Sequence, residues 1–155
     1  MMNRRYLLGA STAGLAGGAL FLVGGGRNLY YAAITEDFEG DMITPAQAHA
    51  AAQRGDILLI DIRRPDEWVG AGSGEGAHRL DMRREDFMQE LAKLVSTRED
   101  VPVALICARG VRSAWLANRL KAAGFTRIID VPEGMLGSTA GPGWLKRGLP
   151  LVKDE

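Results

Sequence analysis

The chain has 155 residues, enough for one domain with a hydrophobic core and too few for two. Nineteen basic residues balance nineteen acidic ones, so the charge gives no reason to expect a nucleic-acid partner. One cysteine excludes an internal disulfide and a thiolate metal cluster, and His49 and His78 lack the spacing of a metal site. We therefore expect neither a metal nor another cofactor.

The first residues have the pattern of an export signal or a membrane anchor. Arg4 and Arg5 precede an uncharged run, residues 6–26, and the stretch from Asn3 to Leu8 resembles the twin-arginine export motif. The run has about the 20 residues that a bilayer crossing needs, and no clear cleavage site follows it. We expect residues 1–27 to be a signal peptide or an anchor, which contacts the membrane through residues 6–26 if uncleaved. The domain would then be exported, either periplasmic or anchored outside the cytoplasm.

A linker over residues 28–40 is expected to lead into one domain over residues 41–155. Thr44 and Pro45 predict a helix start, with a capping hydroxyl followed by proline in the first turn. This helix is expected to end at Gly55. Residues 57–60 are wholly apolar, which predicts a strand buried on both faces of a sheet.

Strands and helices alternate through the rest of the chain. Four glycines within residues 70–76 predict a loop. The apolar spacing further predicts strands near 77–81, 103–106 and 127–131, helices over 85–95 and 113–123, and a terminal helix over 133–147 that glycines interrupt. This alternation indicates an α/β fold with a mainly parallel central sheet flanked by helices.

The only cysteine, Cys107, directly follows the apolar run of residues 103–106. A short loop with one glycine and two arginines then leads into a helix, so the thiol faces a helix amino end, where backbone N–H groups favour a thiolate. A small buried hydrophobe is the alternative role for such a cysteine. Asp61 also ends a predicted strand, and the carboxyl ends of parallel strands share one edge of the sheet. The sequence therefore predicts a site at that edge.

Three segments resemble a single-domain sulfurtransferase of the rhodanese type. Residues 58–68 are similar to its Asp-x-Arg-x-x-x-Glu-aromatic signature, and residues 107–113 match its Cys-x-x-Gly-x-Arg-Ser loop. Segments between 124 and 150 resemble its closing motifs, while the glycine-rich stretch 70–76 departs from its usual Gly-His-Ile. The resemblance implies a rhodanese-like three-layer fold and a thiosulfate sulfurtransferase-like enzyme.

The reaction that the resemblance implies moves a sulfane sulfur from a small anionic donor, such as thiosulfate, to Cys107, and from there to a nucleophilic acceptor. Cys107 is the expected catalytic residue, with loop amides stabilising its anion and Arg112 attracting the donor. The alternative for Arg112 is a residue at the helix start that is turned to solvent or paired with Asp or Glu. For Arg109, a role in the site and such a structural role both stay open. The expected substrate-binding residues are Ala108, Arg109, Gly110, Val111, Arg112 and Ser113.

A second set of residues is expected to support the loop rather than to touch the substrate. Asp61 either orients the loop through its amides or caps the turn after its own strand. Arg63 and Glu67 are four residues apart and are expected to pair across one helical turn. Ser113 is expected to be a helix cap.

Two other functions compete with sulfur-transfer catalysis. A sulfur carrier, or a module that docks onto an exported partner protein, would have the same loop and little turnover. Cysteine phosphatases and arsenate reductases on this scaffold place five residues between cysteine and arginine, whereas four separate Cys107 from Arg112. The tighter loop favours sulfur over a tetrahedral oxyanion. A Cys-His protease is not expected, because neither histidine is evidently placed as a base.

Overall fold

The computed structural model describes residues 26–96 and 101–153. The predicted leader, residues 1–27, lies almost wholly outside these ranges. Within the described ranges no helix is long and apolar enough to cross a membrane.

Five parallel strands form the central sheet in the order β1-β6-β5-β2-β4. They are β1 (Asp41–Met42), β2 (Leu58–Asp61), β4 (His78–Arg79), β5 (Val103–Ile106) and β6 (Ile128–Asp130). The central strands β2 and β5 run in register from Leu58 beside Val103 to Asp61 beside Ile106. Two short strands, β3 (Ser73–Gly74) and β7 (Leu151–Val152), pair antiparallel away from this sheet.

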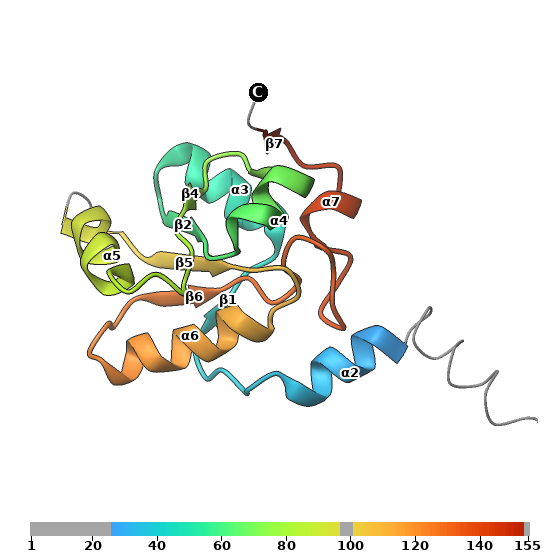
Figure 1. The fold of residues 1–155 in the computed structure, drawn as a ribbon, viewed down its shortest axis with the longest axis horizontal. Coiled ribbons are helices and arrows are strands. Elements are labelled where there is room, and N and C mark those ends of the chain that lie inside the picture. The colour runs from blue at the N-terminus through green and yellow to red at the C-terminus, as the bar shows by residue number, and fades with distance from the viewer. Residues whose placement is uncertain (1–25, 97–100, 154–155) are drawn as a thin grey trace, which may run out of the picture.

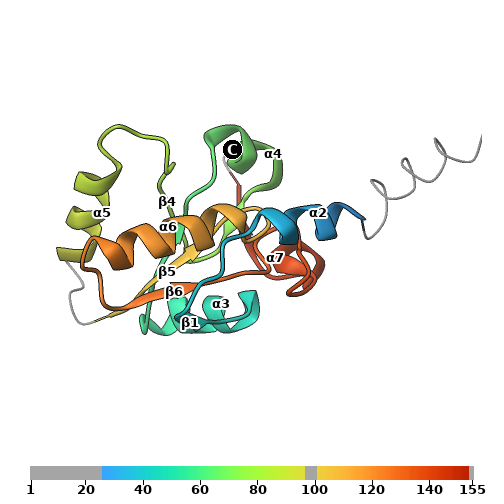
Figure 2. The same cartoon turned by 90° about the horizontal axis from the view of Figure 1, so that it is seen from below.

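Helices cover both faces of the sheet, which gives three layers (Figures 1 and 2). Alternate residues of β2 and β5 enter two separate cores, because successive side chains of a strand point to opposite faces. One core, with Ile60 and Leu105, packs against α5 (Phe87–Ser96) and α6 (Val111–Ala122). The other, with Leu59 and Ile106, packs against α3 (Pro45–Arg54) and α7 (Gly143–Lys146). The predicted α/β class and parallel sheet are confirmed.

The start of α3 follows the sequence signals closely. The Thr44 hydroxyl accepts the Gln47 N–H, the Gln47 side chain accepts the Thr44 N–H, and Pro45 occupies the first helical position. Gly55 ends the helix with a φ of 77°. Local chemistry therefore sets both ends of this helix.

Three elements differ from the sequence predictions. The stretch 70–76 is not a plain loop, because it holds the end of α4 (Pro65–Ala71) and strand β3. The terminal helix expected over 133–147 is reduced to α7, and the residues before it form turns. Helix α6 begins at Val111 with Gly110 as its N-cap, so the prediction that Ser113 caps it is wrong.

The segment expected to be a linker, residues 28–40, contains most of α2 (Gly26–Ile34) and contacts α6. Arg119 pairs with Glu36 at 2.6 Å, and Asn118 donates to the carbonyl of Asp37 at 3.0 Å. The Lys121 ammonium also donates to the carbonyl of Glu39. Figures 1 and 2 both show α2 lying beside the amino end of α6, which brings it to the edge of the sheet where Cys107 lies.

Candidate functional site

The site lies at the carboxyl edge of the sheet, where three neighbouring strands end in polar residues. Asp61 ends β2, Cys107 follows β5, and Asp130 ends β6. These strands are adjacent in the sheet, so the edge predicted from Asp61 and Cys107 exists and includes a third residue, Asp130.

The Cys107 sulfur is held by the turn that leads into α6. Its Sγ accepts the N–H of Gly110 at 3.2 Å and lies 3.6 Å from the Ser113 hydroxyl. Among the described residues, Gly110 supplies the one backbone N–H that bonds to the sulfur, so the wider ring of loop amides is not seen. Sulfur at the amino end of α6 is placed where a negative charge is stabilised.

Gly110 is needed for this turn for two reasons. Its φ of 85° lies in the left-handed region, which side chains with a Cβ rarely adopt. A Cβ at this position would also collide with the carbonyl oxygen of Pro132. Any other residue would have to move the turn and with it the N–H that bonds to Cys107.

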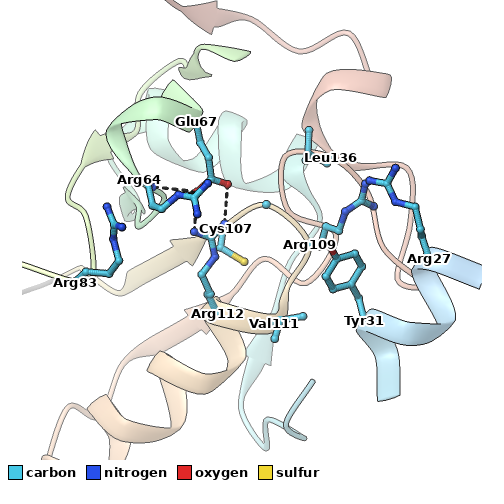
Figure 3. Close-up of a pocket in the computed structure, with 11 residues that line it drawn as sticks. Arg27, Tyr31, Arg64, Glu67, Arg83, Cys107, Arg109, Val111, Arg112 and Leu136 are labelled. Carbon is cyan, nitrogen blue, oxygen red and sulfur yellow. Dashed lines mark hydrogen bonds and ion pairs between the residues drawn. The ribbon is translucent and has the colours of Figure 1, made fainter. Parts of the chain in front are cut away.

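Cys107 lines a pocket of about 450 Å³, although the residue is only 1% exposed. The thiol is therefore protected by the surrounding chain but open to this pocket. Figure 3 shows Arg112 and Glu67 on one side of Cys107, and Arg109, Tyr31 and Arg27 on the other. The pocket thus combines the predicted loop with residues of α2 and α4.

The pocket is strongly basic. Its lining holds one carboxylate, that of Glu67, against five guanidinium groups, those of Arg27, Arg64, Arg83, Arg109 and Arg112. Arg64 and Arg83 also pair with Asp66 and Asp81. The remaining excess of positive charge favours an anionic ligand beside the sulfur.

Arg112 is fixed by Glu67 of α4. Both terminal nitrogens of the guanidinium donate to the Glu67 carboxylate, at 2.8 and 2.7 Å. These hydrogen bonds raise the pKa of Arg112, and negative charge at Cys107 adds to the effect. Burial would raise the pKa of Glu67, but the hydrogen bonds from Arg112 and the Arg64 N–H lower it overall. The pair is therefore ionised, and it directs Arg112 toward the pocket.

The expected pair between Arg63 and Glu67 is wrong, because Arg63 instead binds Asp61. Its Nε and Nη2 donate to the Asp61 carboxylate at 2.9 and 2.7 Å, and both residues are buried. Asp61 also accepts from the Ser73 hydroxyl, and Arg63 donates to the carbonyl of Gly72. Of the two alternatives for Asp61, its bonds fit the stabilisation of its own turn, since they lead to β3 and not to the loop of Cys107.

Arg109 is held by α2 and by the segment that follows β6. Its Nη1 donates to the Asn28 side chain at 3.1 Å and to the carbonyl of Gly137 at 2.9 Å. Its guanidinium carbon lies 5.2 Å from the centre of the Tyr31 ring, within the range of a cation–π contact. Sequence reasoning missed Asn28 and Tyr31, because nothing local shows that α2 returns to the site.

Asp130 is the other residue that sequence reasoning missed. It is 1% exposed, and its Oδ1 has no hydrogen-bond partner among the described residues. Burial raises the pKa of Asp130 to about 6, and hydrogen bonding to Ser113 and the Val131 amide only partly offsets this. An acidic residue ending an apolar strand at the same edge as Cys107 was the available signal.

The fold and the site define an α/β domain with a single cysteine at the carboxyl edge of a parallel sheet. A family model for the rhodanese-like domain matches residues 44–139, and the chain belongs to this family.

The relatives include sulfur-transfer enzymes. The chain is 29% identical to thiosulfate sulfurtransferase GlpE of Glaesserella parasuis over 70% of its own length and 90% of the relative's. It is 24% identical to the uncharacterized protein YibN of Escherichia coli, over 74% and 73% of the two chains. The polysulfide-sulfur transferase of Wolinella succinogenes superposes with a TM-score of 0.57 at 25% identity, over 90% and 93% of the two chains. Sulfur transfer is thus supported at the level of the family.

We predict that Asp130→Asn stabilises the protein at neutral pH but not in acid. The pKa of Asp130 is higher in the folded protein than in the unfolded one. Protonated Asp130 therefore favours the folded state at low pH, and this contribution to the free energy of unfolding is lost as the pH rises through about 6. A rise in pKa of this size corresponds to about 2–3 kcal/mol in the free energy of unfolding. Urea unfolding of both proteins at pH 4.5 and 7.5 should show the asparagine variant gaining clearly more unfolding free energy at the higher pH. An equal difference in unfolding free energy between variant and wild type at both pH values would contradict the prediction.

Proposed function

We propose that this chain catalyses transfer of a sulfane sulfur from an anionic donor such as thiosulfate, through a persulfide on Cys107, to a nucleophilic acceptor. The observation that carries the proposal is the position of the Cys107 sulfur. It accepts the Gly110 N–H at the start of α6 and opens into a pocket lined by arginines. The thiosulfate and polysulfide transferases among the relatives support the class of reaction.

The proposed first step is a displacement at sulfur. The Cys107 thiolate attacks the outer sulfur of thiosulfate, a bond forms between the two sulfurs, and the donor S–S bond breaks. Sulfite leaves with the bonding electron pair, so the charge is conserved and no external oxidant is needed. In the second step the acceptor attacks the outer sulfur of the persulfide and regenerates the thiolate.

Each loop residue has a proposed part in these steps. The Gly110 amide and the amino end of α6 stabilise the negative charge of the thiolate and of the persulfide. The Ser113 hydroxyl, 3.6 Å from Sγ, donates to the carbonyl of Gly110 at 3.1 Å and so holds the turn beside the sulfur. Arg112 and Arg109 hold the anionic donor, while Ala108 and Val111 form the wall of the pocket next to the sulfur.

Exchange of Cys107 for serine is predicted to abolish sulfur transfer and leave the fold intact, because serine keeps the shape but provides a far poorer nucleophile. Intact-mass spectrometry after thiosulfate treatment should show one added sulfur atom on the wild type and none on Cys107→Ser. Cyanide should then remove that sulfur as thiocyanate. Thermal unfolding of the two proteins checks that both are folded.

The loading experiment, together with an aryl phosphatase assay, separates the competing functions. Stoichiometric loading without turnover would make the protein a sulfur carrier, or a module that serves a partner protein. Hydrolysis of an aryl phosphate that depends on Cys107 would instead indicate a phosphatase. No loading from any sulfane donor would overturn the proposal.

Arg112→Ala is predicted to lower kcat/KM for thiosulfate by about 10-fold or more, because a charge-assisted contact with the donor is lost. A neutral organic trisulfide should be affected less, since it lacks the charge that Arg112 attracts. Arg84→Ala is the matched control, because it removes one exposed guanidinium that pairs with Asp86 and does not line the pocket. Equal losses of kcat/KM for the charged and the neutral donor would argue against a role of Arg112 in attracting the anionic donor.

Export through the first 27 residues is also part of the proposal, and it is supported by Arg4, Arg5 and the uncharged run after them. The full chain with a carboxyl-terminal tag should fractionate with the periplasm or the membrane. Replacement of both arginines by lysine should reduce this fraction if the twin-arginine motif is used. A chain found in the cytosol with Met1 intact would contradict export.

A further inference from the structure

A second basic hollow adjoins the pocket of Cys107. It has a volume of about 400 Å³ and shares Arg27, Arg109 and Leu136 with the first pocket. Lys146 of α7 lines the second hollow only. The two hollows therefore border each other at the three shared residues, with Cys107 in the first and Lys146 in the second.

The charges around the second hollow are not balanced by the protein. Its lining contains no carboxylate, although it contains Arg27, Arg109 and Lys146. Within residues 26–96 and 101–153, no acidic side chain pairs with any of these three. Like charges brought together repel one another, and an anion between them would relieve that repulsion.

One of these cations is held in place before any ligand arrives. Arg109 uses Nη1 for Asn28 and Gly137, and its guanidinium carbon lies 5.2 Å from the centre of the Tyr31 ring. Figure 3 shows Arg27 extending from α2 toward the same side of the pocket. A guanidinium fixed in this way loses little freedom on binding a carboxylate.

The size of the two hollows indicates an organic ligand. Cavities of a few hundred Å³ match organic small molecules, and an inorganic anion such as thiosulfate would fill only the part next to Cys107. Leu136 lies where the two hollows meet and gives an apolar surface for a methylene chain. A ligand with sulfur at one end and negative charge at the other fits this order of groups.

We propose that the hollow lined by Arg27, Arg109 and Lys146 is a subsite for the carboxylate end of a low-molecular-weight thiol persulfide that donates its sulfur to Cys107. This inference rests on the proposed function and names the class of donor. The Cys107 thiolate attacks the terminal sulfur of the R–S–SH donor and forms a new S–S bond. The donor S–S bond breaks, and R–S⁻ leaves with the electron pair while the proton stays on the transferred sulfur.

The test compares glutathione persulfide, which carries two carboxylates, with its diethyl ester, which carries none. The rate of sulfur transfer from each donor to the full chain is measured, and the rate with Cys107→Ser is subtracted. The wild type should favour the charged donor by about 10-fold or more in kcat/KM. Arg27→Gln and Lys146→Gln should each reduce this preference several-fold.

Lys93→Gln is the matched control, because Lys93 is an exposed residue of α5 that pairs with Glu90 and lines neither hollow. It should keep the preference of the wild type. Equal use of the two donors, or a preference that neither variant at the subsite changes, would overturn the inference. Loading from thiosulfate alone would overturn the subsite and leave the proposed function standing, whereas no loading from any of the three donors would overturn both.

Discussion

The site depends on the contact between the turn at Gly110 and the segment after β6. Gly110 lies against the carbonyl of Pro132, and a Cβ at Gly134 would come within 2.6 Å of the carbonyl of Ala108. The N–H groups of Met135 and Leu136 donate to the carbonyls of Cys107 and Ala108. The two stretches of irregular backbone thus form hydrogen bonds with each other. Glycine in both stretches permits their close contact. This packing aims the Gly110 N–H at the sulfur, and the start of α6 follows from the same turn.

Two acidic residues, Asp61 and Glu67, each fix the position of one arginine. Asp61 binds Arg63 in a buried pair that joins the end of β2 to Gly72 and Ser73, whereas Glu67 binds Arg112 at the edge of the pocket. The buried pair is costly to desolvate and is compensated by several hydrogen bonds, which makes it a fixed anchor. The partly buried pair keeps one guanidinium in the pocket that the sulfur also lines. Because α4 begins at Pro65, two residues after Arg63, the anchor also sets the position of Glu67.

The sequence predicted those features that depend on local chemistry. The ends of α3 follow from Thr44, Pro45 and Gly55, and β5 follows from its apolar run, because neighbours in sequence determine both. The partner of Glu67 was predicted wrongly because a spacing of four assumes one helix, and Arg63 precedes α4. Asp130 and α2 were missed for another reason. Their places depend on how distant segments pack, and periodicity within a short window does not carry that information.

Helix α2 has a consequence for how this domain is delimited. The family match starts at residue 44, yet Asn28 and Tyr31, well before that boundary, contact Arg109 beside the sulfur. A shortened chain cut at the family boundary would lose the edge strand β1 but keep the other four strands of the central sheet and the whole cysteine loop. It would lack one wall of the basic pocket and the hydrogen bond that orients Arg109. The ligand preference of such a chain would differ from that of the full protein, even where its spectra looked native.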